Sequence, residues 1–202
     1  MRVTGEPSII PLAEIPQTAF DGSPDLWSVA QDLQDICADP ANQDLLLGFR
    51  PTVEAYSKPL NAVRERLLAR QRKAQEHPDQ FQSFLALVPQ EYEQDVKIPS
   101  RLVVVGLGII TVLSEERVPK GINPAWPNLS SLISAPFRGQ GIGGLLLRSR
   151  LTLADEQFEG AWTSVRPDNT ASQGNVLKAG FRYISQSVVD GVLENHYIRP
   201  RS

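Results

Sequence analysis

The sequence predicts an α/β protein of the α+β type, with strands and helices sharing a single domain over residues 1–202. Two observations carry this prediction. Helical spacing of apolar residues dominates residues 1–80, whereas strand patterns alternate with helices over residues 81–202. A strand pattern also leads into a glycine-rich turn that opens an apolar helix, over residues 129–147. The expected order is a strand, helices, three strands, a helix, a strand, a helix and two strands.

Composition limits the class of protein. The length of 202 residues and the hydrophobic content of 41% suit one domain with its own core. A formal net charge of −3 argues against a nucleic acid or a membrane surface as the main partner. The single cysteine, Cys37, is typical of a reducing compartment. No apolar signal-peptide core follows Met1, and no apolar run reaches the ~20 residues that span a bilayer, so we expect a cytoplasmic protein.

The N-terminal part is expected to be mostly helical. Residues 8–15 predict an edge strand, because Pro11 lacks the amide that an interior strand needs. Ser23 is typical of a helix N-cap, and apolar residues then recur at helical spacing as far as Cys37. Another helix is expected over residues 57–77, and its basic side chains suit a solvated face better than an acidic partner.

Strand patterns begin at residue 81. Residues 81–88 and 102–113 predict two strands, separated by a polar turn region over residues 89–100. Gly106 and Gly108 interrupt the second strand, which indicates a bulge or a close approach of another group.

The C-terminal half is expected to alternate between strands and helices. A loop over residues 119–127 leads to the fourth strand, the glycine-rich turn, a helix over residues 141–154 and a fifth strand over residues 161–165. Asp168 is a plausible N-cap for the next helix, and Gly180 suits the position just after its end. Asp190 and Gly191 predict a two-residue hairpin turn between the last two strands.

The glycine-rich turn suits a diphosphate. Its glycines are Gly139, Gly141, Gly143 and Gly144. The first amides of a helix have no internal partner and lie at the positive end of the helix dipole, and glycines let a phosphate approach them. The dinucleotide fingerprint fits the spacing poorly, and the lysine of a P-loop is absent after Gly143.

The turn matches R-x-x-G-x-G as Arg138, Gly141 and Gly143, and Asn169 and the pair Gly180-Phe181 follow it. Over about residues 129–199 this arrangement resembles the Gcn5-related N-acetyltransferases (GNAT), whose acetyl-CoA signature is [Q/R]-x-x-G-x-[G/A]. The resemblance implies a central mixed, mostly antiparallel sheet flanked by helices, with an extended helical N-terminal segment. Residues 1–80 would then form the substrate side, and residues 81–202 the acetyl-CoA-binding core.

The resemblance also implies a function and a site. The chain is expected to be an N-acetyltransferase that moves an acetyl group from acetyl-CoA to a primary amine by direct attack. The backbone of Ile133 and Ser134 would hold the pantetheine arm, and Asn169 would contact it. The pyrophosphate would bind the backbone of Arg138, Gly139, Gln140, Gly141, Ile142 and Gly143. One cysteine and two scattered histidines form no ligand cluster, so no metal is expected.

Two positions depart from the common family pattern. Many members carry a tyrosine, as proton donor to the CoA thiolate, where this sequence has Val176. A subgroup that includes ribosomal-protein N-terminal acetyltransferases instead has Asn-x-x-Ser, which Asn169 and Ser172 match. The resemblance therefore assigns Ser172 as the catalytic proton donor, although a serine there could also only cap or pack. It favours a peptide amine as acceptor, beside small-molecule amines.

The sequence leaves several residue roles open. The general base is either an acid such as Glu115 or Glu116, which otherwise form a solvated turn, or a more distant acid reached through water. We expect His77 and His196 at the surface, Trp162 in the core or the acceptor cleft, and Arg148 and Arg150 in solvent or at the CoA 3′-phosphate. The family also makes a homodimer an option. A degenerate relative that binds acyl-CoA as a sensor or scaffold, and an unrelated nucleotide-binding domain, are the alternative functions.

Overall fold

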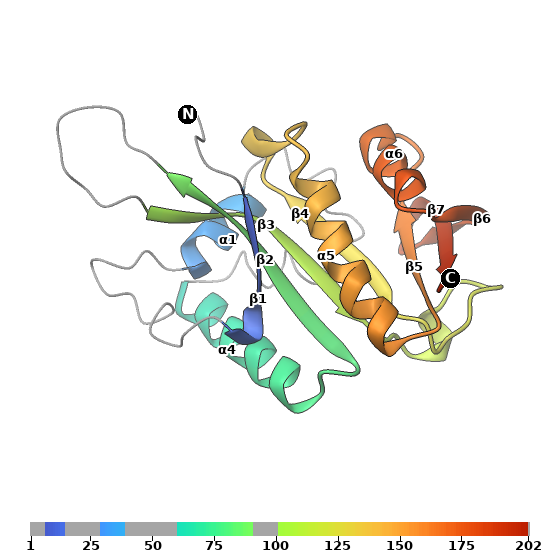
Figure 1. The fold of residues 1–202 in the computed structure, drawn as a ribbon, viewed down its shortest axis with the longest axis horizontal. Coiled ribbons are helices and arrows are strands. Elements are labelled where there is room, and N and C mark those ends of the chain that lie inside the picture. Colours follow the sequence, from blue (N-terminus) through green and yellow to red (C-terminus); the bar gives the residue numbers. More distant parts are fainter. Residues whose placement is uncertain (1–6, 15–28, 39–59, 91–100, 202) are drawn as a thin grey trace.

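The computed structural model describes residues 7–14, 29–38, 60–90 and 101–201 of the chain (Figure 1). Its seven strands form one sheet in the order β1-β2-β3-β4-β5-β7-β6. The strands are β1 (Ser8–Pro11), β2 (Phe81–Gln90), β3 (Arg101–Thr111), β4 (Asn128–Ile133), β5 (Gly160–Val165), β6 (Arg182–Val189) and β7 (Val192–Pro200). The helices are α1 (Val29–Ala38), α4 (Leu60–Glu76), α5 (Ile142–Gln157) and α6 (Thr170–Lys178), with short 3-10 turns at Leu12–Glu14, Glu115–Arg117 and Ala135–Phe137. The predicted order of elements is confirmed.

Helices cover both faces of this sheet. Leu33 of α1 and Leu67 of α4 are buried in one cluster with Leu107 of β3. On the other face, Leu146 of α5 is buried in a cluster with Leu129 of β4. Figure 1 shows α5 crossing the sheet. Helices α1 and α4 lie on the side of the sheet with β1 and β2, and α6 lies on the side with β5. All neighbouring strands pair antiparallel except β4 and β5, which confirms a mixed, mostly antiparallel sheet.

Local signals predicted the first strand and the last turn, but not where that strand ends. Among the described strands, β1 is an edge strand paired with β2, and it ends at Pro11 instead of residue 15, because Leu12–Glu14 form a 3-10 turn. Asp190 and Gly191 have φ values of 49° and 80°, the left-handed backbone that a two-residue hairpin turn requires. The predicted helix starts at Ser23 and Ser57 lie outside the described residues.

The turn region expected over residues 89–100 begins too early. β2 continues through Pro89 and Gln90, which pair with Leu102 and Arg101 of β3. The prediction failed because pairing with a long neighbouring strand outweighs the poor strand propensity of a proline. The remaining residues of that region, 91–100, lie outside the described part of the chain.

A bulge in β3 sets the end of β4. The register between β2 and β3 shifts at Ala86/Leu87, which leaves Val105 as the extra residue. The Asp32 carboxylate of α1 accepts the Val104 amide at 3.0 Å, and the Val105 carbonyl accepts the Ser134 amide at 2.8 Å. The bulge therefore ties α1 and the residue just after β4 to the same point of the sheet.

Gly160, the first residue of β5, lies under the indole of Trp126. A Cβ atom on Gly160 would lie 2.7 Å from Trp126 Cε2, closer than real contacts allow. We expect Gly160→Ala to lower the free energy of unfolding by about 1–3 kcal/mol, because the rigid ring must move. Urea unfolding followed by tryptophan fluorescence measures this change.

Gly174 provides the control for that variant. It lies inside α6, and a Cβ atom there would meet no heavy atom within 4 Å. Gly174→Ala should stabilise the protein by up to about 1 kcal/mol through helix propensity. A Gly160→Ala protein as stable as the parent would show that Trp126 is not seated on this glycine.

Candidate active site

The sheet opens between β4 and β5. Both strands are described throughout, and their only bridge pair is Asn128 with Trp162, near the start of each strand. The Trp162 amide donates to the Pro127 carbonyl at 3.0 Å. One step further, the Thr163 side chain, through Oγ1, donates to the Leu129 carbonyl at 2.7 Å, where a regular ladder would use a backbone amide. The two strands therefore separate toward their carboxyl ends.

Backbone groups of β4 face this opening. Successive residues of a strand direct their amides to opposite neighbours. The Ser134 amide bonds to Val105 of the β3 bulge, so the amides of Ser131 and Ile133 are directed toward β5. Ile133 thus presents an N–H group to the split, as its predicted role requires. The Ser134 amide is already used, and its carbonyl accepts from Phe137 at 3.0 Å.

The glycine-rich turn forms a cradle of amides beside the split. Within the described residues, the amides of 139–143 donate to no backbone carbonyl. Gly139 and Gly141 have φ values of 76° and 81°, and a Cβ atom on either would meet no heavy atom within 4 Å. Gly141 is the N-cap of α5, so the positive end of this 16-residue helix dipole adds to the amides. The arrangement suits a diphosphate.

The Arg138 and Gln140 side chains turn back onto the chain. Arg138 Nε donates to the Ile133 carbonyl at 3.3 Å, and the Arg138 amide donates to Ala135 at 3.2 Å. Gln140 Nε2 donates to the Pro136 carbonyl at 3.1 Å. The Arg138 side chain therefore braces the end of β4. The Arg138 amide is used as well, so five of the six amides predicted to bind the pyrophosphate, those of residues 139–143, are left for a ligand.

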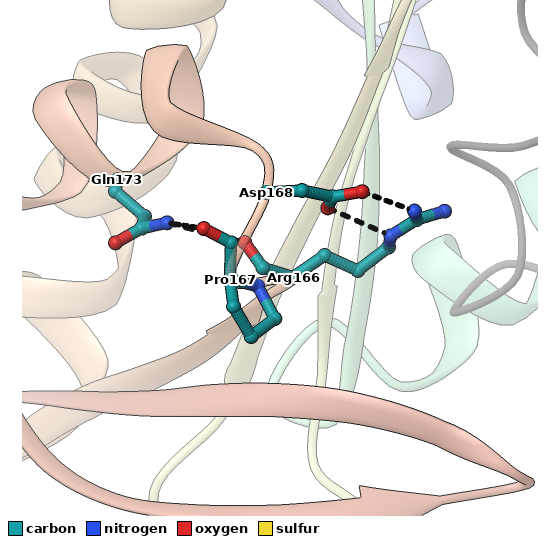
Figure 2. A network of polar contacts seen from close by, with 4 residues as sticks. All are labelled: Arg166, Pro167, Asp168 and Gln173. Carbon is teal, nitrogen blue, oxygen red and sulfur yellow. Dashed lines mark hydrogen bonds and ion pairs between the residues drawn. The ribbon is translucent and has the colours of Figure 1, made fainter.

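The corner between β5 and α6 is held by side chains. Figure 2 shows the Arg166 guanidinium facing the Asp168 carboxylate, with Gln173 bonded to the Pro167 carbonyl at 2.7 Å. The Tyr197 hydroxyl of β7 donates to Gln173 Oε1 at 3.1 Å. The start of α6 is thereby fixed relative to the sheet.

The N-cap of α6 differs from the prediction. Asn169 is the N-cap, and its Oδ1 accepts the Ser172 amide at 3.1 Å. Asp168 was predicted as the cap, but its carboxylate is committed to Arg166, whose hydrogen bond lowers the pKa of Asp168. An ionised pair with two contacts outcompetes a single bond to a backbone amide.

Ser172 lies half-buried in the first turn of α6. Within the described residues its hydroxyl makes no hydrogen bond, so it is not consumed by capping. Val176, at the position of the family tyrosine, is buried in the core with Phe181. Asn175 of α6 lies against the cradle, because a Cβ atom on Gly143 would be 3.6 Å from its Nδ2. The middle of α6 therefore lies against the first turn of α5.

Two predictions about basic residues of this half were wrong. Arg150 is 1% exposed, so it lies neither in solvent nor at a phosphate. Its guanidinium donates to the carbonyls of Leu146, Ile109 and Ser130, at 3.0 Å and 3.3 Å for the first two. Burial lowers the pKa of Arg150 to about 9, which leaves it protonated near neutral pH. His196 was expected at the surface and is fully buried, whereas His77 is exposed.

Trp162, Glu115 and Glu116 are the other residues whose roles the sequence left open. Trp162 is 3% exposed and packs with Ile122 and Ile198. Glu115 and Glu116 are exposed in a 3-10 turn, where a hydrogen bond from Ser114 lowers the pKa of Glu116. Neither acid is buried in the split. Within the described residues, no group of three or more His, Cys, Asp or Glu side chains could hold a metal ion.

A mixed sheet split between two parallel strands, with an amide cradle at the helix N-terminus beside it, defines the GNAT-type acetyltransferase fold. Solved structures bear this out over nearly the whole chain. RimL, a ribosomal L7/L12 α-N-protein acetyltransferase in complex with coenzyme A, has a TM-score of 0.64 at 13% identity, covering 98% of this chain and 96% of its own. RimJ of Mycobacterium smegmatis, in complex with a CoA disulfide, has a TM-score of 0.60 at 15% identity, covering 96% and 81%.

A third solved structure of similar fold belongs to a protein named for a different acceptor. The aminoglycoside acetyltransferase AAC(6')-Ib, in complex with coenzyme A, has a TM-score of 0.58 at 14% identity, covering 97% of this chain and 95% of its own. No protein-family model matches the chain, and no curated protein matches it by sequence. The described helices include none that is long and apolar enough to cross a membrane.

Proposed function

We propose that the chain is an acetyl-CoA-dependent N-acetyltransferase that moves the acetyl group to a primary amine by direct attack. The observation that carries the proposal is the row of five amides, residues 139–143, that donate to no carbonyl of the described backbone and lie at the start of α5 beside the β4–β5 split. The amides bind the pyrophosphate, and the split admits the pantetheine arm. The Ile133 amide and the half-buried Asn169 side chain border that arm.

Ser172 supplies the proton for the departing thiolate in this proposal. Its hydroxyl is uncommitted within the described residues and lies in the first turn of α6, where the helix dipole favours a developing negative charge. The buried Val176 leaves no donor at the usual family position. Asn169 and Ser172 give the Asn-x-x-Ser pattern of the ribosomal-protein subgroup, so a peptide α-amine is the first acceptor to try.

Turnover and binding together test the proposal. Free-CoA release is measured with acetyl-CoA and tetrapeptides with free N-terminal Ala, Ser or Met, and with spermidine and kanamycin. Acetyl-CoA, NAD and ATP binding are measured in parallel by thermal shift. The proposal expects acetyl-CoA to bind and at least one amine to be acetylated. Acetyl-CoA binding without turnover would favour the alternative in which the protein binds acyl-CoA as a sensor or scaffold. Binding of NAD or ATP in place of acetyl-CoA would contradict acetyl-CoA as the co-substrate.

Ser172→Ala tests the proton donor. We expect kcat to fall about 10- to 100-fold with little change in the KM for acetyl-CoA, because a proton donor acts on the leaving group and not on binding. Thr170→Ala is the control, since Thr170 is exposed in the same turn of α6. Steady-state kinetics of the three proteins decide the point, and an unchanged kcat in Ser172→Ala would leave the serine only a structural role.

A further inference from the structure

A buried histidine links three strands at the edge of the split. His196 of β7 is 0% exposed, and both of its ring nitrogens contact serine hydroxyls. Ser164 Oγ of β5 lies 2.7 Å from Nδ1, and Ser187 Oγ of β6 lies 2.6 Å from Nε2. Ser164 is half-buried and Ser187 is exposed. The three side chains thus form a continuous hydrogen-bonded line from the interior of the sheet to its surface.

The inner end of this line lies at the split. Ser164 is two residues beyond Trp162, the last residue of β5 that pairs with β4. Its side chain shares the face of Trp162, which packs with Ile122 and Ile198, while α5 covers the other face. An arm that starts at the N-terminus of α5 and passes through the split would bring its acyl end toward Ser164.

The same face is polar beside Ser164. Asn128 and Ser130 of β4 lie on the face of Trp162, and the Ser130 hydroxyl donates to the Asn128 side chain. Glu194 of β7 is 9% exposed, and its pKa is raised by burial, lowered by a hydrogen bond from Ser164 and raised by Asp190. An amine that approached the split from this face would therefore meet hydroxyls and one carboxyl group.

The imidazole is suited to pass a proton on and not to keep it. Burial lowers the pKa of His196 below its ordinary value, which favours the neutral ring over the imidazolium. Glu194 lies two residues from His196 on the same strand and Asp190 lies in the β6–β7 turn, while β5 and β6 contribute the hydroxyls of Ser164 and Ser187. A neutral ring that donates from Nε2 to Ser187 leaves the Nδ1 lone pair directed at Ser164, whose one hydroxyl proton is shared between Nδ1 and the Glu194 carboxyl group.

We propose that Ser164, His196 and Ser187 form a relay that takes the proton from the acceptor amine and passes it to solvent. The inference rests on the proposed acetyl transfer. Ser164 would touch the ammonium group, and His196 acts through Ser164. The relay supplies the general base that the exposed Glu115 and Glu116 do not provide.

The protons balance along this path. The ammonium group gives one proton to Ser164 Oγ, while the Ser164 proton moves to His196 Nδ1. The neutral amine then forms the C–N bond to the thioester carbon, and the C–S bond breaks. After the attack the nitrogen loses its second proton to water, and the thiolate takes one proton from Ser172, which water reprotonates, so these two transfers cancel. The imidazolium releases its Nε2 proton to Ser187 and water. After the product leaves, the Nδ1 proton passes through Ser164 to water while Nε2 regains one through Ser187, so the ring is restored and one proton is released for each acetyl group transferred.

A purely structural role is the competing explanation for His196, since the ring also bridges β5 and β6 across β7. The two roles differ in their dependence on pH. A relay is needed only while the acceptor is an ammonium ion, whereas a structural bridge is needed at every pH. A peptide α-amine, with a pKa of ~8, becomes neutral without help by about pH 9.5.

The experiment compares His196→Gln and Ser164→Ala with the parent protein, on the tetrapeptide that the parent acetylates best. We expect kcat/KM near pH 7 to fall about 10-fold in each variant, because only about one-tenth of an amine with a pKa of ~8 is neutral there. At about pH 9.5 the deficit should shrink to less than about twofold, because the amine is already neutral. The double variant should be no slower than either single variant, since both remove the same relay.

Two serines of β6 provide a matched pair. Ser187 contacts His196, whereas Ser185 stands opposite His196 in the strand register without bonding to it. Ser187→Ala should lower kcat/KM by about 2- to 3-fold, because water can reach the exposed position and replace the hydroxyl in part. Ser185→Ala should match the parent protein.

The outcomes separate the relay from the acetyltransferase itself. Acetyl-CoA binding is measured for every variant, and Ser164→Ala tests the relay with the imidazole retained, although it removes the hydroxyl partner of Nδ1. An equal loss at about pH 7 and about pH 9.5 would make His196 structural and overturn the relay, as would unchanged turnover in Ser164→Ala. Either result leaves the acetyltransferase proposal standing. A parent protein that binds acetyl-CoA and acetylates no amine overturns both.

Discussion

Gly141→Asp is expected to weaken acetyl-CoA binding by about 100-fold, which is ~3 kcal/mol. Gly141 is the N-cap of α5, and its surroundings leave open space for a side chain. A carboxylate there places a negative charge among the amides that receive the pyrophosphate. Two like charges about 4 Å apart near a protein surface repel by up to ~4 kcal/mol, so a loss of this size needs only part of the full interaction. Isothermal calorimetry with acetyl-CoA measures the change.

Two controls isolate the charge in that experiment. Gly141→Asn has nearly the same shape and the same tolerance of left-handed backbone, so it should retain most of the affinity. Gly121→Asp changes a glycine of similar φ, 90°, with the same open surroundings in the loop before β4. It should cost similar stability and leave affinity unchanged. Added salt should restore part of the affinity of Gly141→Asp alone. If Gly141→Asp and the parent protein bound acetyl-CoA with equal affinity, the proposal that the pyrophosphate binds at this turn would be wrong.

The glycine-rich turn was predictable because its chemistry is local. Four glycines within a short stretch after a strand pattern determine where a helix starts and which amides are left unbonded. The same holds for the turn at Asp190 and Gly191, whose positive φ values are a property of the two residues themselves. The N-cap of α6 shows the limit of such signals, since Asp168 and Asn169 are both good caps and only the position of Arg166 decides between them.

The polar line through His196 was missed for the opposite reason. Its members lie on three strands, at residues 164, 187 and 196, and come together only through the register of β5, β6 and β7. The sequence held no clear signal, because the face of the last strand that carries His196 also carries Glu194 beside Val192 and Ile198, so alternation does not mark it as covered. A buried histidine needs polar partners from other strands, and no sequence spacing identifies them.

Arg150 escaped prediction in the same way. It follows three leucines in a helix with a basic neighbour, Arg148, which is exposed. Only the tertiary structure shows that the guanidinium lies over the sheet and donates to the carbonyls of Ile109 and Ser130. Space for it exists because β3 has Gly108 at that point. The close approach that the sequence suggested for this glycine is thus made by an arginine from α5.

Gly108→Ala is expected to lower the free energy of unfolding by about 1–3 kcal/mol. The new Cβ atom would lie 2.9 Å from Arg150 Nε and 3.0 Å from Arg150 Cδ. Both atoms belong to the middle of a side chain whose end is held by carbonyls of β3 and β4, so they cannot move aside without breaking those bonds. Urea unfolding of the variant measures the cost.

A double-mutant cycle with Arg150→Leu assigns that cost to the arginine. Leucine is shorter and carries no group bonded to β3 or β4, so the added methyl of Gly108→Ala should be tolerated better in its presence. We expect a coupling energy of at least about 1 kcal/mol between the two positions, whatever Arg150→Leu costs alone. Contact of the same methyl with Leu146, 3.0 Å away, remains in both backgrounds and cancels. Additivity within about 0.5 kcal/mol would mean that Gly108 does not make room for the buried guanidinium.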